Sequence, residues 1–134
     1  MADADALKVQ GNAAMAAGKP QEAVEHYTAA LAAQPSHALH SNRSAAYAAL
    51  GDFEKALEDG EQAVALKPDW GKGYARKAFA LEKLGRHAEA LQAYEEGLRV
   101  EPASAAMQQN KAALEAKLAQ QQQQGARPPP PPEP

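Results

Sequence analysis

The stretch Gly51-Asp-Phe-Glu-Lys-Ala-Leu-Glu-Asp-Gly-Glu-Gln-Ala-Val-Ala-Leu-Lys-Pro68 runs from a glycine to a proline, and its pattern occurs three times along the chain. The three copies begin at Gly18, Gly51 and Gly85, and they end at Pro35, Pro68 and Pro102. Successive copies of both residues are 33 and then 34 residues apart. A fixed period of this size indicates a repeat architecture, in which one structural unit stacks on copies of itself.

Between each glycine and proline, apolar and small residues recur at i, i+1, i+4, i+7 and i+8, which is one face of an α-helix. The three sets are Ala23, Val24, Tyr27, Ala30 and Leu31; Ala56, Leu57, Gly60, Ala63 and Val64; and Ala90, Leu91, Tyr94, Gly97 and Leu98. An earlier helix in each unit is expected to end at the glycine, because glycine adopts the left-handed conformation that closes many helices. Asp52 and Asp69 are expected to cap the helices that follow them.

These patterns predict an all-α fold, an α-solenoid of three helix-turn-helix repeats followed by a capping helix. The repeats are expected at about residues 4–36, 37–69 and 70–103, with the capping helix over 104–119. Such a repeat cannot bury its own apolar face, so neighbours and a terminal cap are required. The cap is expected to cover the last repeat with Ala106, Ala113, Leu114 and Leu118. Residues 1–119 would then form a single domain.

The segment 120–134 differs in composition from the rest of the chain. Glutamines occupy positions 120–124, and six of the ten prolines follow them, so the segment has little to bury. We expect a disordered tail or linker, and such an end is also typical of the first part of a larger protein. Docking of the prolines to an SH3 or WW groove is the alternative.

Composition supports a helical protein and excludes several function classes. The chain of 134 residues is 45% hydrophobic and only 5% aromatic, and about a quarter of it is alanine, which suits closely packed helices. The absence of cysteine excludes disulfides, thiolate zinc sites and thiol nucleophiles. The net charge of −3 argues against binding to nucleic acid or a membrane surface. We expect a monomeric, cytoplasmic domain, with nuclear shuttling left open, because neither a signal peptide nor a membrane span is evident.

A helical pair of about this length with glycine, alanine, an aromatic and proline at these places resembles the tetratricopeptide repeat. The first repeat keeps the pattern at Gly11, Ala23, Tyr27, Ala30 and Pro35. The second departs at Gly60, where an aromatic is usual, and the third at Gly97, where alanine is usual. Both changes remove volume, so the packing around these two positions is expected to differ locally.

A polar stripe crosses the first helices of the three repeats. Lys8 and Asn12 are four residues apart, as are Lys72 and Arg76, and Asn42 precedes Arg76 by one repeat of 34 residues. The stripe holds donors and no carboxylate, although the chain has more acidic than basic residues. Such donors suit one or two carboxylates of a ligand, and the alternative is a row of solvated surface charges. A floor of small residues would strengthen these bonds, namely Ala45, Ala46, Ala48 and Ala49.

The segments Lys8–Asn12, Ser41–Ala48 and Lys67–Lys77 resemble the carboxylate-clamp class of these repeats. More narrowly, the chain is similar to the N-terminal repeat domain of the co-chaperone family that organises Hsp70 and Hsp90. This resemblance implies a binding site for the C-terminal Glu-Glu-Val-Asp tail of Hsp70, with Hsp90 less favoured. The clamp residues that it implies are Lys8, Asn12, Asn42, Lys72 and Arg76.

The same resemblance implies further contacts with the part of the peptide upstream of its acidic end. They fall on Ala80–Leu84, which includes Glu82 and Lys83. Lys83 stands where an aromatic occurs in some members, and Ala49 replaces a longer, charged side chain. Both departures bear on the choice between Hsp70 and Hsp90.

Other features favour no catalytic or metal function. His37 and His40 have a spacing that two metal ligands can have, but no third histidine or nearby carboxylate is evident. Gly18-Lys19-Pro20 lacks the spacing of a phosphate loop, and no serine is paired with a base. Trp70 and Phe53 are expected to pack between helices. We therefore expect neither an enzyme nor a cofactor, and the alternative function is a scaffold that assembles through its convex face or capping helix.

Overall fold

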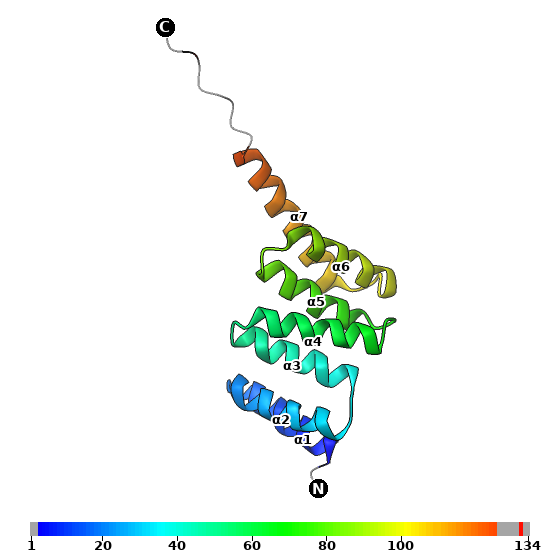
Figure 1. Ribbon diagram of the computed structural model, residues 1–134. Coiled ribbons are helices and arrows are strands. Elements are labelled where there is room, and N and C mark those ends of the chain that lie inside the picture. Colours follow the sequence, from blue (N-terminus) through cyan, green and yellow to red (C-terminus); the bar gives the residue numbers. More distant parts are fainter. Residues whose placement is uncertain (1–2, 126–131, 133–134) are drawn as a thin grey trace.

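The computed structural model describes residues 3–125 and 132, and this part of the chain contains seven helices and no strand. Helices 1 to 6 form three antiparallel pairs that stack along one direction, and the seventh follows the last pair (Figure 1). Their bounds are α1 (Ala4–Ala16), α2 (Pro20–Ala33), α3 (His37–Ala49), α4 (Phe53–Leu66), α5 (Gly71–Lys83), α6 (His87–Val100) and α7 (Ala105–Gly125). The predicted all-α solenoid of three repeats is confirmed.

The turn inside each repeat is built on a left-handed glycine. Gly18, Gly51 and Gly85 have φ angles of +73°, +79° and +79°. After Gly51, the N–H of Asp52 donates back to the carbonyl oxygen of Tyr47 at 2.9 Å, and the equivalent bonds close α1 and α5. Glycine is needed here for its backbone conformation, because a Cβ atom would meet nothing within 4 Å at any of the three positions.

The two predicted caps have different outcomes. Asp52 caps α4 by accepting a hydrogen bond from the backbone N–H of Lys55 at 3.2 Å, as predicted. The prediction for Asp69 is wrong, because α5 begins after Trp70 and has no local side-chain cap. Instead the carboxylate of Glu101 accepts the N–H of Gly71 at 3.2 Å. A distant carboxylate thus satisfies a helix end that the local sequence leaves open.

The two unusual glycines allow close helix packing. A Cβ atom at Gly60 would lie 2.8 Å from the backbone nitrogen of Lys77, so α4 and α5 approach backbone to backbone. At Gly97 it would lie 2.5 Å from the sulfur of Met107, which occupies the space that a larger residue would need. The volume that these positions lack is therefore filled by neighbours, and the repeat packing is continuous.

The capping helix covers the last repeat with part of the predicted face. Ala106 and Ala113 are exposed, whereas Met107 and Leu114 are 2% and 1% exposed and Leu118 is half-buried. The prediction is confirmed for Leu114 and Leu118 and wrong for Ala106 and Ala113, and it omits Met107, which is buried against the last repeat. The helix also continues to Gly125 rather than ending near Ala119, so residues 120–125 are helical, consistent with the fair helix propensity of glutamine. The predicted disorder of 126–131 and 133–134 lies outside the described residues.

The stack places the first helix of each repeat on its inner side. Helix α3 contacts both α1 and α5, whereas among the described residues the second helices of successive repeats have no comparable mutual contact. The surface formed by α1, α3 and α5 is therefore the concave one, and we call it the groove. In the part of the chain that is described, none of the helices combines the length and the apolar character needed to cross a membrane.

Candidate functional site

Side chains from the first three helices meet at Asn12. The amide nitrogen of Asn42 on α3 donates to the Asn12 Oδ1 atom at 3.4 Å, and the hydroxyl of Tyr27 on α2 donates to the same oxygen at 2.5 Å. Because two donors occupy this oxygen, the amide nitrogen of Asn12 is left to donate elsewhere. Burial raises the pKa of the Tyr27 hydroxyl, which therefore remains a donor at neutral pH.

A second contact joins α3 to α5. The Nε atom of Arg76 donates to the hydroxyl of Ser41 at 3.3 Å, and Ser41 is fully buried. Burial lowers the pKa of the Arg76 guanidinium below its ordinary value, yet arginine stays charged at neutral pH. This bond uses only Nε, so the two terminal nitrogens of the guanidinium are not consumed by it. The side chain is thus anchored while its charge remains able to act on a ligand.

The two predicted lysines lie at different places along the groove. Lys72 and Arg76 line a cavity of about 370 Å³ between α5 and α7. Lys8 is half-buried one helical turn before Asn12, and it lines a separate, smaller cavity of about 110 Å³ beside Ser36 and Leu39. The structure therefore brings Asn12 next to Asn42 and places Lys72 beside Arg76, with Lys8 at the α1 end.

The four predicted floor alanines differ in exposure. Ala45 and Ala48 are half-buried and Ala49 is exposed. Ala46 is 0% exposed and packs in the core with Leu7 and Leu39, so its side chain cannot contact a ligand. Its place in the predicted floor is therefore wrong, since the helix turns this position inward.

Glu82 and Lys83 have separate roles in the structure. The carboxylate of Glu82 accepts a hydrogen bond from the Tyr94 hydroxyl at 3.2 Å, which links α5 to α6 within the last repeat. Burial, with the charge of Glu82 beside it, raises the pKa of Tyr94. Lys83 is exposed, and its ammonium lies 5.4 Å from the centre of the Phe79 ring. Glu82 is thus engaged internally, whereas Lys83 stays at the surface.

Sequence reasoning missed two residues of the groove. Phe79 is 39% exposed and lines the cavity with Lys72 and Arg76. Its spacing of i+7 from Lys72 and i+3 from Arg76 could have identified it. Glu101 lines the same cavity, and it adds a carboxylate to a stripe that contains none in sequence. No local signal could have found Glu101, because the turn after α6 brings it there.

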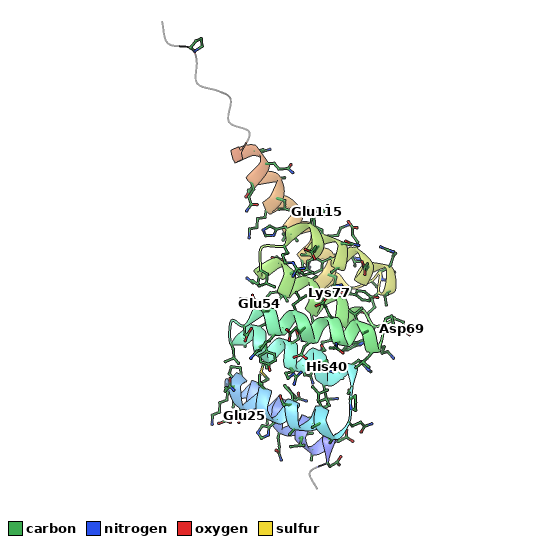
Figure 2. All side chains as sticks on the ribbon, in the orientation of Figure 1. Glu25, His40, Glu54, Asp69, Lys77 and Glu115 are labelled. Atoms are coloured by element: carbon green, nitrogen blue, oxygen red, sulfur yellow. The ribbon has the colours of Figure 1, made fainter. Side chains whose placement is uncertain are left out.

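A buried ionic cluster holds the central helix in place. The Asp59 carboxylate on α4, only 2% exposed, accepts hydrogen bonds from Arg43 Nε and Nη2, both at 2.8 Å, and lies 2.9 Å from His40 Nδ1. Arg43 Nη1 also donates to the hydroxyl of Thr28 on α2 at 3.1 Å. The bonds to Asp59 raise the pKa of Arg43. The cluster ties α2, α3 and α4 together, and Figure 2 labels His40 within the stack.

The two spaced histidines do not face a common site. His40 has the carboxylate partner that the sequence did not reveal, whereas the His37 ring packs edge-on against Trp70 at 4.7 Å. Phe53 packs edge-on against Phe79 at 6.4 Å. In residues 3–125 and 132, no group of three or more acidic or histidine side chains is arranged to hold a metal ion.

Comparison with known proteins shows that the chain is similar to the repeat domains of several named proteins. It is 48% identical over 102 residues to the Hsp70-Hsp90 organizing protein of Triticum aestivum, an alignment that covers 75% of this chain and 18% of that protein. The chain thus spans about a fifth of that relative. The Sgt2 TPR domain from Aspergillus fumigatus is 36% identical with a TM-score of 0.88, and the match covers 97% of this chain and 87% of that domain.

Two similar solved structures hold chaperone peptides. The first TPR of Spaghetti (RPAP3), bound to the HSP90 peptide SRMEEVD, is 34% identical with a TM-score of 0.83, covering 87% of this chain and 96% of that one. The second TPR domain of human RPAP3, in complex with the HSP70 peptide SGPTIEEVD, is 32% identical with a TM-score of 0.80, covering 84% and 94%. Tetratricopeptide repeat models match residues 9–69 and 71–104. With its three stacked helix pairs, the chain belongs to the tetratricopeptide repeat family.

Proposed function

We propose that the groove binds the C-terminal tail of a chaperone that ends in Glu-Glu-Val-Asp, by a carboxylate clamp. The observation that carries this proposal is the pair of bonds from Asn42 to Asn12 and from Arg76 to Ser41, which align donors of α1, α3 and α5 along one surface. A terminal aspartate offers two carboxylates within a few ångströms, and a row of cationic and amide donors is complementary to both. The domain acts in this proposal as a binding module, not as an enzyme.

Each clamp residue has an assigned role. Lys8, Asn12, Asn42 and Lys72 hold the main-chain and side-chain carboxylates of the terminal aspartate. Arg76 reaches a backbone or side-chain oxygen further up the peptide. The amides add donors without adding like charge, so the cluster is less self-repelling than a row of lysines alone.

The known peptide complexes of similar domains support this choice of ligand. Both bound peptides end in Glu-Glu-Val-Asp, and they differ upstream, where one has Met and the other Thr-Ile. We further propose that this chain prefers the Hsp70 tail over the Hsp90 tail. Support for the preference comes from the similarity of the chain to the first repeat domain of the co-chaperone organisers.

Binding of the peptide by the clamp is mainly electrostatic, and this limits its affinity. The clamp contacts themselves are polar or charged, so we expect an affinity on the order of micromolar, or about −7 to −8 kcal/mol. Lys72 is exposed, so added salt should weaken binding.

Calorimetry with the peptide Ile-Glu-Glu-Val-Asp tests the proposal. Amidation of the peptide C-terminus should remove most of the binding heat, because one of the two terminal carboxylates is lost. Lys117→Ala serves as the matched control, since Lys117 is an exposed lysine on α7 outside the clamp. Full affinity for the amidated peptide would refute the clamp. Indifference to groove variants together with a concentration-dependent mass in light scattering would favour the scaffold function.

A further inference from the structure

The chain has five serine and threonine hydroxyl groups, and the structure gives them different surroundings. Ser41 and Ser44 are 0% and 2% exposed, and Thr28 lies inside helix α2. Ser36 and Ser104 lie in links between helices, and both are half-buried. Because an enzyme that modifies a side chain needs an accessible segment outside the regular helices, these two serines are the candidates for modification.

Ser104 is the last residue of an exposed link between α6 and α7. Residues 101–103 are all exposed, so an enzyme can approach this link from solvent. The hydroxyl of Ser104 accepts a hydrogen bond from the backbone N–H of Met107 at 3.3 Å, which caps the start of α7. The side chain is thus held among the residues that line the cavity between α5 and α7.

The charges around this cavity favour the addition of an anion. Lys72 and Arg76 bring two positive charges to it, and Glu101 brings one negative charge, so their sum is +1. The carboxylate of Glu101 already accepts the N–H of Gly71, which compensates part of its charge. Asn110 adds an amide that can donate a hydrogen bond. Donors from both α5 and α7 therefore face any negative group that is added at this cavity.

The surroundings of Ser36 are less favourable to an anion. Ser36 lines a cavity of about 110 Å³ together with Lys8 and Asp5, whose charges offset each other. The cavity at Ser104 is larger, at about 370 Å³, and its cations outnumber its carboxylate. Of the two accessible serines, Ser104 is therefore the one whose modification by an anionic group the structure favours.

We propose that Ser104 is a phosphorylation site, and that its phosphate closes the groove by binding Lys72 and Arg76. This proposal rests on the proposed clamp, to which both cations belong. A phosphoserine carries about −1.5 to −2 charges at neutral pH and three acceptor oxygens. It therefore competes with the carboxylates of the peptide for the same donors.

A protein kinase supplies the phosphoryl group from a nucleoside triphosphate. The Ser104 oxygen forms a bond to the γ-phosphorus, and the bond from that phosphorus to the β–γ bridging oxygen breaks. The nucleoside diphosphate leaves, and the hydroxyl proton passes to a base of the kinase. The product keeps an oxygen at the start of α7, where a negative charge is also favourable.

Calorimetry with the peptide Ile-Glu-Glu-Val-Asp compares the unmodified domain with a domain synthesised with phosphoserine at position 104. The phosphate should weaken binding at least about tenfold, because it occupies two charged donors of the clamp. Ser104→Asn keeps a neutral cap for α7, and its affinity should stay within about twofold of the wild type. Phosphoserine in place of Ala112, an exposed residue of α7 outside the cavity, controls for added charge and should weaken binding less than about threefold.

Phosphorus NMR tests the contact directly and without a peptide. The phosphate at Ser104 should titrate at a lower pH than the phosphate at position 112, because adjacent cations favour its doubly charged form. Lys72→Ala in the domain phosphorylated at Ser104 should move this titration back to higher pH. Identical titrations of the two phosphates would overturn the contact with Lys72 and Arg76.

Mass spectrometry tests whether the site is used. The domain and its Ser104→Asn variant are incubated with ATP in a eukaryotic cell extract, and we expect a phosphate on residue 104 of the wild type alone. An unmodified Ser104 overturns its assignment as a phosphorylation site.

The outcomes also separate this regulation from the clamp itself. If amidation of the peptide abolishes its binding to the unmodified domain, the clamp stands, and an equal affinity of the phosphorylated domain then overturns the regulation alone. If amidation changes nothing, the clamp has failed, and the regulation of peptide binding fails with it.

Discussion

The two ends of the groove hold their polar groups in different ways. At the α1–α3 end, the neutral amides Asn12 and Asn42 are bonded to each other and to the buried hydroxyl of Tyr27. At the α5–α7 end, the cation Arg76 shares a cavity with the carboxylate of Glu101 and the ring of Phe79. One end offers donors alone, and the other mixes charge of both signs with apolar surface. The two ends of the groove therefore differ both in charge and in apolar surface.

The largest expected effect comes from removing the buried ionic cluster of Asp59, Arg43 and His40, which supports α3 between the two ends of the groove. Asp59→Ala leaves Arg43 and His40 without their buried carboxylate, and we expect a loss of about 3 kcal/mol in the free energy of unfolding. Chemical denaturation measures it, with Glu58→Ala as the exposed control on the same helix. A loss below about 1 kcal/mol would mean that the cluster does not hold α3.

Removal of a clamp donor should have the next largest effect. It also tests the difference in charge between the two ends of the groove. Lys72→Ala and Asn42→Ala each remove a bond to a carboxylate, worth about 1.5–3 kcal/mol, so peptide affinity should fall roughly tenfold to a hundredfold. Only Lys72→Ala should also reduce the dependence of affinity on salt, because asparagine carries no charge. Equal salt dependence in both variants would contradict the described difference between the ends.

The hydroxyl of Tyr27 should have a moderate effect on binding. Tyr27→Phe removes the donor that orients Asn12, and we expect a threefold to tenfold loss of affinity, or about 1 kcal/mol. Tyr94→Phe is the matched control, because its hydroxyl bonds to Glu82 within the last repeat. That variant should alter thermal stability and leave peptide affinity unchanged. A similar loss of affinity in both would show that the effect is general destabilisation.

The smallest effect is expected at the surface lysine beside the apolar cavity. Lys83→Ala removes a cation that lies 5.4 Å from the Phe79 ring, an interaction worth about 0.5 kcal/mol at an exposed site. Peptide affinity should change less than about threefold, as measured by calorimetry with SGPTIEEVD. A tenfold change would give Lys83 a direct part in binding, contrary to its exposed position.

Local sequence patterns predicted the helices and turns of the fold, because each of these features depends on interactions between residues that are close in the chain. The left-handed glycines at 18, 51 and 85 and the cap at Asp52 are such features. Asp69 was predicted by the same rule and does not cap, since α5 begins after Trp70 and leaves Asp69 one residue before the N-cap position. Ala46 was placed in the groove by its neighbours in sequence, yet the helix turns it into the core.

The sequence by itself determined the repeat period, the helix pairs and the stripe of clamp candidates, because periodicity and spacing depend only on chain geometry. Only the tertiary structure decided that Met107 is buried on α7, where Glu101 lies and which donors are engaged. These features depend on contacts between helices that are far apart in the chain. A pattern within one helix cannot show which residue of another helix will stand opposite it.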